Sequence, residues 1–251
     1  MTEKELYDSL NNSNQTGFVQ NERERGLNMA LPALMRKVYI WMTLALAITG
    51  VVAFGVASSP VLVTKLFMGG TTTMWILMIA ELGLVWFLSA RVMKMSLQTA
   101  TLMFIVYSIL NGVTLSVIFL AFSGALIAQA FFITAGTFGA MALYGYTTKK
   151  DLSSIGSILF MALIGLIIAS IVNYFLGNSM LDLIISVAGV LIFVGLTAWD
   201  TQKIKAMLEE YAYDMSEGSQ KLALLGALTL YLDFINLFIY ILRLLSKLQR
   251  D

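Results

Sequence analysis

Residues 222–245 read LALLGALTLYLDFINLFIYILRLL, an apolar run with Asp233 at its centre and Arg243 near its end. A helix needs about 20 consecutive apolar residues to cross the ~30 Å of hydrocarbon in a bilayer. This stretch is therefore long enough to span a membrane as one helix. A charged side chain at such a depth is costly, so Asp233 is expected to face the protein interior or water rather than lipid.

Six further apolar runs precede this stretch, and together they predict an all-α membrane protein with seven transmembrane helices. Outer-membrane barrels show short alternating segments instead of unbroken apolar runs, which excludes that class. We expect a polar N-terminal tail over residues 1–36 and a seven-helix transmembrane domain over residues 37–248. The predicted spans cover about 38–58, 73–92, 99–122, 125–146, 155–176, 181–199 and 222–245.

The composition narrows the classes of function. The chain is 59% hydrophobic and only 12% charged, which is too little charge to cover a water-facing globule. It has no Cys and no His, which removes thiol nucleophiles, histidine bases and nearly every transition-metal site. Sixteen basic residues against 15 acidic residues give no charge excess that would attract nucleic acid. We therefore expect neither an enzyme nor a bound cofactor.

Lysine and arginine are distributed unevenly between the two sides of the predicted spans. The tail and the loops at 91–98, 147–154 and 203–221 share one side and carry twelve of the 16 basic residues. Basic residues concentrate on the cytoplasmic side of membrane proteins. The N-terminus is therefore expected in the cytoplasm and the C-terminus outside. A re-entrant last segment would instead return the C-terminus to the cytoplasm.

Two aspartates are predicted to lie at the same height in the last two spans. Asp200 lies 16 residues before the turn signal Ser216-Glu217-Gly218, and Asp233 lies 15 residues after it. If both arms are helical, each carboxylate is roughly 23 Å from the turn at a rise of ~1.5 Å per residue. This pairing requires that residues 201–213 extend the sixth helix. Asp200 also begins a polar run, so an interfacial position is the alternative interpretation.

Two carboxyl groups in contact inside a low-dielectric bundle resist ionising together and share a proton over part of the pH range. Asp200 and Asp233 are therefore candidates for a proton-sensitive gate or a proton relay. When both are ionised they would bind a cation such as Ca²⁺, which prefers several oxygen ligands. Asn236, one turn beyond Asp233, is a candidate further ligand or a partner in an interhelical hydrogen bond.

A second spacing involves the second and seventh spans. Glu81 precedes Arg91 by ten residues, and Asp233 precedes Arg243 by ten. Ten helical residues cover ~15 Å, so two antiparallel helices could pair Arg91 with Asp233 and Glu81 with Arg243. This arrangement predicts ionic latches at two depths. Both arginines are equally consistent with side chains that reach the lipid head groups.

Other functional classes use similar residues. An intramembrane aspartyl protease also needs one aspartate on each of two neighbouring helices, but its Gly-x-Gly-Asp setting is absent, since Leu230-Tyr231-Leu232 precede Asp233. A proton-coupled transporter should show discontinuous helices and repeats, and no convincing repeat is present. A regulatory membrane protein that acts through partner proteins is a further alternative.

The residues around the aspartates resemble a known family. Leu230 to Phe238 (LYLDFINLF) and Trp199 to Ile204 (WDTQKI) resemble motifs of the last two helices of the Bax inhibitor-1, or transmembrane Bax inhibitor motif, family. Tyr107 to Ile118 resembles the third-span signature, and Leu88 to Arg91 the end of the second span. The resemblance covers roughly residues 30–247 and is to a bacterial member.

The resemblance implies a seven-helix fold with the last helix central, and a pH-sensitive Ca²⁺ leak across the membrane. On the matching motifs, Asp200 and Asp233 would be the family's pH-sensing pair and Arg91 its nearby arginine. Glu81 and Arg243 fall where a second ionic contact would be expected. The implied partners are calcium ions, protons and membrane lipid, and the implied location is the cytoplasmic (inner) membrane.

Overall fold

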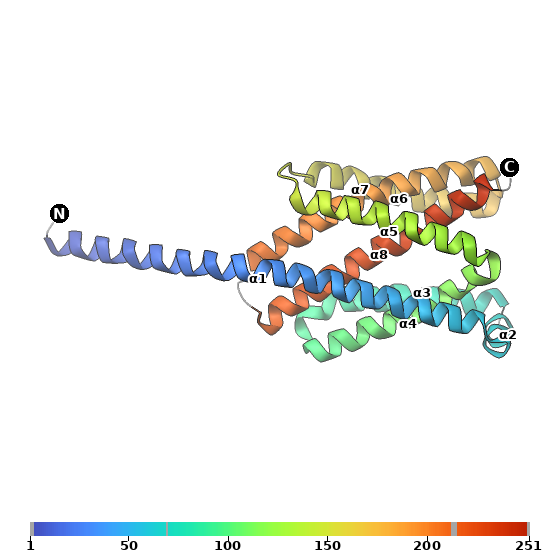
Figure 1. Cartoon of the computed structure of the whole chain (residues 1–251), viewed down its shortest axis with the longest axis horizontal. Helices are drawn as coiled ribbons and strands as arrows, with labels where there is room; N and C mark the ends of the chain where they lie inside the picture. The colour runs from blue at the N-terminus through green and yellow to red at the C-terminus, as the bar shows by residue number, and fades with distance from the viewer. Residues whose placement is uncertain (1–2, 69, 212–214, 250–251) are drawn as a thin grey trace.

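The computed structural model describes residues 3–68, 70–211 and 215–249 (Figure 1). Within these residues the chain forms α-helices joined by short turns. The elements in chain order are α1 (Glu3–Ala57), α2 (Pro60–Met68), α3 (Gly70–Arg91), the 3-10 helix η1 (Val92–Lys94), α4 (Leu97–Ala121), α5 (Gly124–Thr147), α6 (Ser153–Leu176), α7 (Ser179–Tyr211) and α8 (Glu217–Leu248).

Seven of these helices are long and apolar enough to cross a membrane, which confirms the predicted fold class and number of spans. The spans are the second half of α1 (residues 30–57), α3 extended through η1, and α4 to α8. The helix α8 is continuous over its whole length and crosses the bundle, so the last span is not re-entrant. The start of α1 and the end of α8 consequently lie at opposite ends of the molecule (Figure 1).

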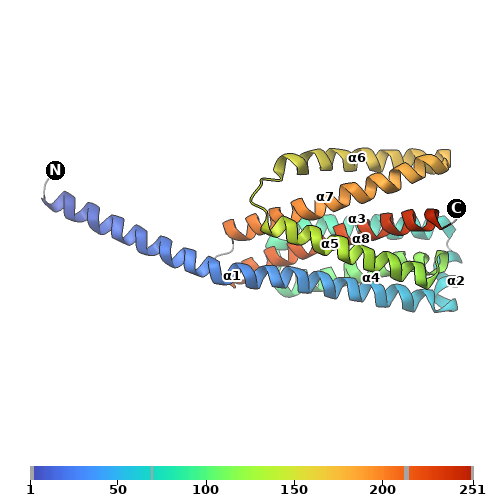
Figure 2. The same cartoon turned by 45° about the horizontal axis from the view of Figure 1, so that its top comes forward.

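The last helix lies at the centre of the bundle. In its apolar window 67% of residues are buried, against 11% in the corresponding windows of α3 and α6. It packs against α1, α4, α5 and α7, whereas α6 packs mainly on α7 and lies at the edge (Figure 2). Because most of α8 is enclosed by protein, a buried polar side chain such as that of Asp233 meets other helices instead of lipid.

The N-terminal region is helical. The helix α1 runs without interruption from Glu3 to Ala57, with Pro32 inside it. Its first half extends away from the bundle, as both overall views show (Figures 1 and 2). The short helix α2 was not predicted, because nine residues are too few to span a membrane.

Capping residues mark the end of α6 and the start of α8, and the second of these lies at Ser216, where the sequence predicted a turn. Gly177 ends α6 in the left-handed conformation, with φ of 62°, which a glycine adopts without strain. The side chain of Ser216 accepts a hydrogen bond from the Ser219 backbone N–H and caps the start of α8. The predicted extension of the sixth helix over residues 201–213 is present as far as Tyr211, and the rest of it lies outside the described residues.

Glycines let α7 approach α5 and α6 closely. A Cβ atom on Gly145 of α5 would lie 2.1 Å from the backbone oxygen of Ala198, and one on Gly156 of α6 would lie 2.2 Å from the ring of Trp199. These contacts hold the residues directly before Asp200 between two helices. By contrast, Gly136 faces open space, since a Cβ atom at this position would have no neighbouring atom within 4 Å.

Candidate functional site

The carboxyl groups of Asp200 on α7 and Asp233 on α8 meet in the interior of the bundle. Asp200 is 9% exposed and Asp233 is 5% exposed. The two side chains are close enough for each to act electrostatically on the other. Two carboxyl groups in this arrangement can form a hydrogen bond only when they share a proton, because an ionised carboxylate can only accept. The structure therefore brings together the two aspartates that the turn position predicted to lie at one height.

The register between α7 and α8 explains this contact. A Cβ atom on Gly226 of α8 would lie 2.8 Å from Ile204 of α7, and one on Gly189 of α7 would lie 2.4 Å from the ring of Tyr240 of α8. These two close contacts lie on either side of the aspartates along the helix pair. Small residues at a helix interface allow backbones to approach closely in a membrane. The carboxyl groups meet because the helices are held together above and below them.

Few other polar groups surround the pair. The basic residue whose charge acts on Asp200 is Lys203, one turn along α7, and its Nζ lies 4.8 Å from the centre of the Trp199 ring. The Oδ2 atom of Asp233 is buried and has no hydrogen-bond partner among the described residues. No third acidic side chain joins the pair within the described part of the chain. Two carboxylates alone supply fewer oxygens than a resident Ca²⁺ ion takes, which suits a transient cation contact better than a permanent site.

The inner latch predicted between Arg91 and Asp233 is not formed in this structure. Arg91 is exposed at the end of α3, where its guanidinium lies 6.0 Å from the centre of the Phe87 ring. The latch required α3 and α8 to be neighbours, whereas α3 packs on α2, α4 and η1. The alternative interpretation, an arginine at the membrane surface, fits this position.

The outer latch between Glu81 and Arg243 is absent for the same reason. Arg243 is exposed, and its guanidinium lies 6.0 Å from the centre of the Tyr240 ring. The amide nitrogen of Asn236 donates to the backbone oxygen of Leu232 at 2.8 Å, which is a bond within α8 and not the interhelical bond that the sequence suggested. The side chains of Arg243 and Asn236 both contact residues of their own helix, α8.

Glu81 instead belongs to a second polar cluster, on the other side of α8. Its carboxylate accepts a hydrogen bond from Thr114 Oγ1 at 2.5 Å and lies 3.5 Å from Asn111 Nδ2. Tyr107 lies against Asn111 and makes an edge-to-face contact with Tyr231 of α8, with 5.9 Å between ring centres. The positions 107, 111 and 114 share one face of α4, a spacing that could have revealed the cluster in the sequence.

Thr49 of α1 extends this cluster through a buried hydroxyl contact. Thr49 Oγ1 donates to the backbone oxygen of Ser108 at 2.9 Å and lies 2.7 Å from the Tyr231 hydroxyl. Because the threonine proton is already used, the tyrosine hydroxyl is the donor of the second bond. The sequence pattern did not indicate either residue, since neither carries a formal charge.

Replacing Thr49 with valine should lower stability by about 1 kcal/mol, because the buried Tyr231 hydroxyl loses its acceptor. Thermal unfolding of the purified protein in detergent measures the effect. Tyr231→Phe should cost a similar amount, and the double variant should cost less than the sum of the two. Thr43→Val, at an exposed position of the same helix, is the control. Strictly additive losses would show that the two hydroxyls do not interact.

The fold and the site define a class of protein: a seven-helix membrane protein whose central last helix carries one member of a buried carboxyl pair. Comparison with known proteins agrees with this class. A family model described as "Inhibitor of apoptosis-promoting Bax1" matches residues 31–250. The chain belongs to the Bax inhibitor-1 family, as its motifs indicated.

Bacterial relatives match over most of their length. Inner membrane protein YbhL of Escherichia coli (strain K12) is 49% identical over 217 residues, which cover 86% of this chain and 92% of that protein. Protein RP147 of Rickettsia prowazekii (strain Madrid E) is 46% identical over 229 residues, which cover 91% and 95%. A protein of Borreliella burgdorferi is 43% identical over 217 residues, which cover 86% and 93%.

Proposed function

We propose that this protein is a pH-sensitive calcium leak channel in which Asp200 and Asp233 act as the proton sensor. The observation that carries the proposal is the contact between the two buried carboxyl groups on neighbouring membrane-spanning helices. Loss of the shared proton leaves two negative charges in contact, which repel each other and attract a cation. Proton concentration and cation binding thus act on the same two groups.

The surroundings of the pair support a gate in preference to a hydrolytic centre. Both aspartates lie within continuous helices, α7 and α8, whose backbone hydrogen bonds leave no unwound segment for a peptide substrate. Repulsion between the charged carboxylates acts directly on the contact between the two helices. A change in the spacing of α7 and α8 would therefore accompany proton loss.

We place the protein in the bacterial inner membrane, with the N-terminus in the cytoplasm. The similarity to an inner membrane protein of Escherichia coli and the seven apolar helices support the membrane. The excess of basic residues at the end of the bundle where α1 enters supports the orientation.

Ca²⁺ entry into liposomes that carry the purified protein tests the proposal. With a calcium indicator inside the vesicles, the entry rate should exceed that of protein-free vesicles and should change between pH 5 and pH 8. An ionophore added at the end of each trace confirms that all vesicles hold a working indicator. Entry no faster than in protein-free vesicles at every pH would reject the channel and favour a proton-coupled transporter or a regulator of other membrane proteins.

A further inference from the structure

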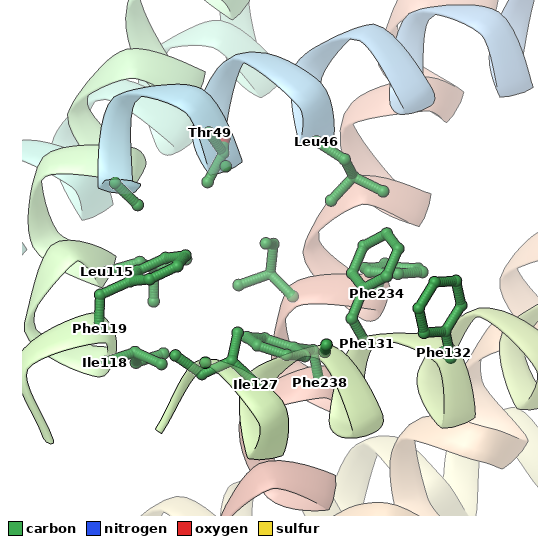
Figure 3. A pocket seen from close by; sticks show the side chains of 15 residues that line it. Leu46, Thr49, Leu115, Ile118, Phe119, Ile127, Phe131, Phe132, Phe234 and Phe238 are labelled. Atoms are coloured by element: carbon green, nitrogen blue, oxygen red, sulfur yellow. The ribbon is translucent and has the colours of Figure 1, made fainter. Parts of the chain in front are cut away.

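A groove between α1 and α5 contains two hollows, and α8 forms the floor of the apolar one, with α4 on its far side. The two helices flank α8 and make no substantial contact with each other (Figure 1). The apolar hollow lies toward the C-terminal end of α1 and has a volume of about 330 Å³. Leu46 of α1, Phe131 of α5, and Phe234 and Phe238 of α8 point into this cavity (Figure 3).

A second hollow follows along the same seam toward the N-terminal side of the bundle. Its volume is about 490 Å³, and it is again lined by α1 and α5. Its lining has a different character, because Arg36, Tyr39 and Tyr146 lie there beside apolar residues. Arg36 is exposed and is the only charged residue in the lining of either hollow. The α1/α5 groove is therefore apolar at one end and cationic at the other.

We propose that the α1/α5 groove binds one phospholipid, with its phosphate at Arg36 and an acyl chain running over Phe234 and Phe238. The polarity of the groove matches that of a phospholipid from end to end. Arginine pairs well with phosphate, and tyrosine hydroxyls favour the head-group region. Helical rise places Gly50 about 21 Å from Arg36, which exceeds half of the ~30 Å hydrocarbon thickness. A chain in the groove thus passes the bilayer midplane.

Two glycines allow the groove to be filled without disturbing the helices. Gly50 lines the apolar cavity and Gly139 lines the cationic hollow, and no atom lies within 4 Å of a Cβ placed on either. A leucine at either position therefore begins in open groove space, since its Cβ atom meets no neighbouring atom. Gly55 of α1 and Gly136 of α5 have equally open surroundings and line neither hollow, so Gly55→Leu/Gly136→Leu is the matched control.

Native mass spectrometry of the detergent-purified protein tests the proposal, with phosphatidylglycerol added as the probe. The wild-type protein and the control should retain one phospholipid each. Gly50→Leu/Gly139→Leu should reduce retention about fivefold or more, which corresponds to a loss of roughly 1 kcal/mol of binding free energy. Equal retention by the groove variant and the control would overturn the proposal, as would wild-type protein that retains no lipid.

Photo-crosslinking tests the same site in the unaltered chain. A phospholipid with a photoreactive acyl chain, in liposomes with the wild-type protein, should label peptides of α1 and α5 around residues 46–53 and 124–132. Labelling spread evenly over α6, which is as little buried as α3, would contradict a bound lipid.

Arg36→Gln should lower phosphatidylglycerol retention, with Lys94→Gln as the control, since Lys94 is exposed and does not line the groove. Unchanged retention in Arg36→Gln would overturn the placement of the phosphate.

Discussion

Asp200→Asn and Asp233→Asn should each make calcium entry independent of pH. Asparagine has the shape of a protonated aspartate and carries no charge, so each variant fixes one member of the pair in its neutral form. The rate at every pH should equal the rate that the wild-type protein reaches at its acidic limit. The ratio of the rates at pH 5 and pH 8 should therefore be about one, because neither variant retains two carboxyl groups that share a proton.

Asp151→Asn is the control for this measurement. Asp151 is exposed in the loop before α6, and hydrogen bonds from Ser153 lower the pKa of its carboxyl group. Its charge therefore does not change between pH 5 and pH 8, and the variant should keep the wild-type pH response. If the two asparagine variants of the pair keep that response as well, the sensor lies elsewhere in the chain.

Gly145→Ala should destabilise the protein by about 3 kcal/mol, the upper part of the range for overpacking a tight contact. The added methyl group would lie 2.1 Å from the backbone oxygen of Ala198, and backbone cannot rotate away as a side chain can. The helices α5 and α7 must separate to accept it, and Ala198 lies two residues before Asp200. The variant should unfold at a lower temperature in detergent and lose the pH response of calcium entry.

Gly136→Ala on the same helix separates this effect from the loss of a glycine itself. Its Cβ atom would meet no other atom within 4 Å, and alanine favours a helix by up to about 1 kcal/mol over glycine. Stability equal to or above wild type is therefore expected. A Gly145→Ala protein as stable as Gly136→Ala would show that α5 and α7 tolerate a wider spacing.

The sequence could predict the features that depend on one helix or one turn at a time. Apolar length gave the seven spans, and the turn at Ser216 gave the common height of Asp200 and Asp233. That distance depends only on helical rise, so it does not require knowledge of how other helices pack. The central position of α8 came from the family motif at Asp233, and the burial of its residues confirms it.

The predictions that were wrong concern which helices are neighbours. The spacing of Glu81 and Arg91 matched that of Asp233 and Arg243, but spacing alone cannot show that α3 lies against α4 instead of α8. The glycines show the same limit, because a small residue within a span predicts a close helix contact wherever it occurs. Close contacts are present at Gly156, Gly189 and Gly195, whereas Gly136, Gly139 and Gly165 face open space.

The two polar clusters restrain the rotation of α8 about its own axis. Asp233 and Tyr231 are two residues apart, which places them about 200° apart around a helix, on nearly opposite sides. One is held by Asp200 and the other by Thr49. A turn of α8 that withdraws the carboxyl group from α7 must also shift the tyrosine hydroxyl against α1. The central helix is thus held on both sides at one level. A rotation of α8 that alters one cluster therefore also alters the other, without any change in helix length.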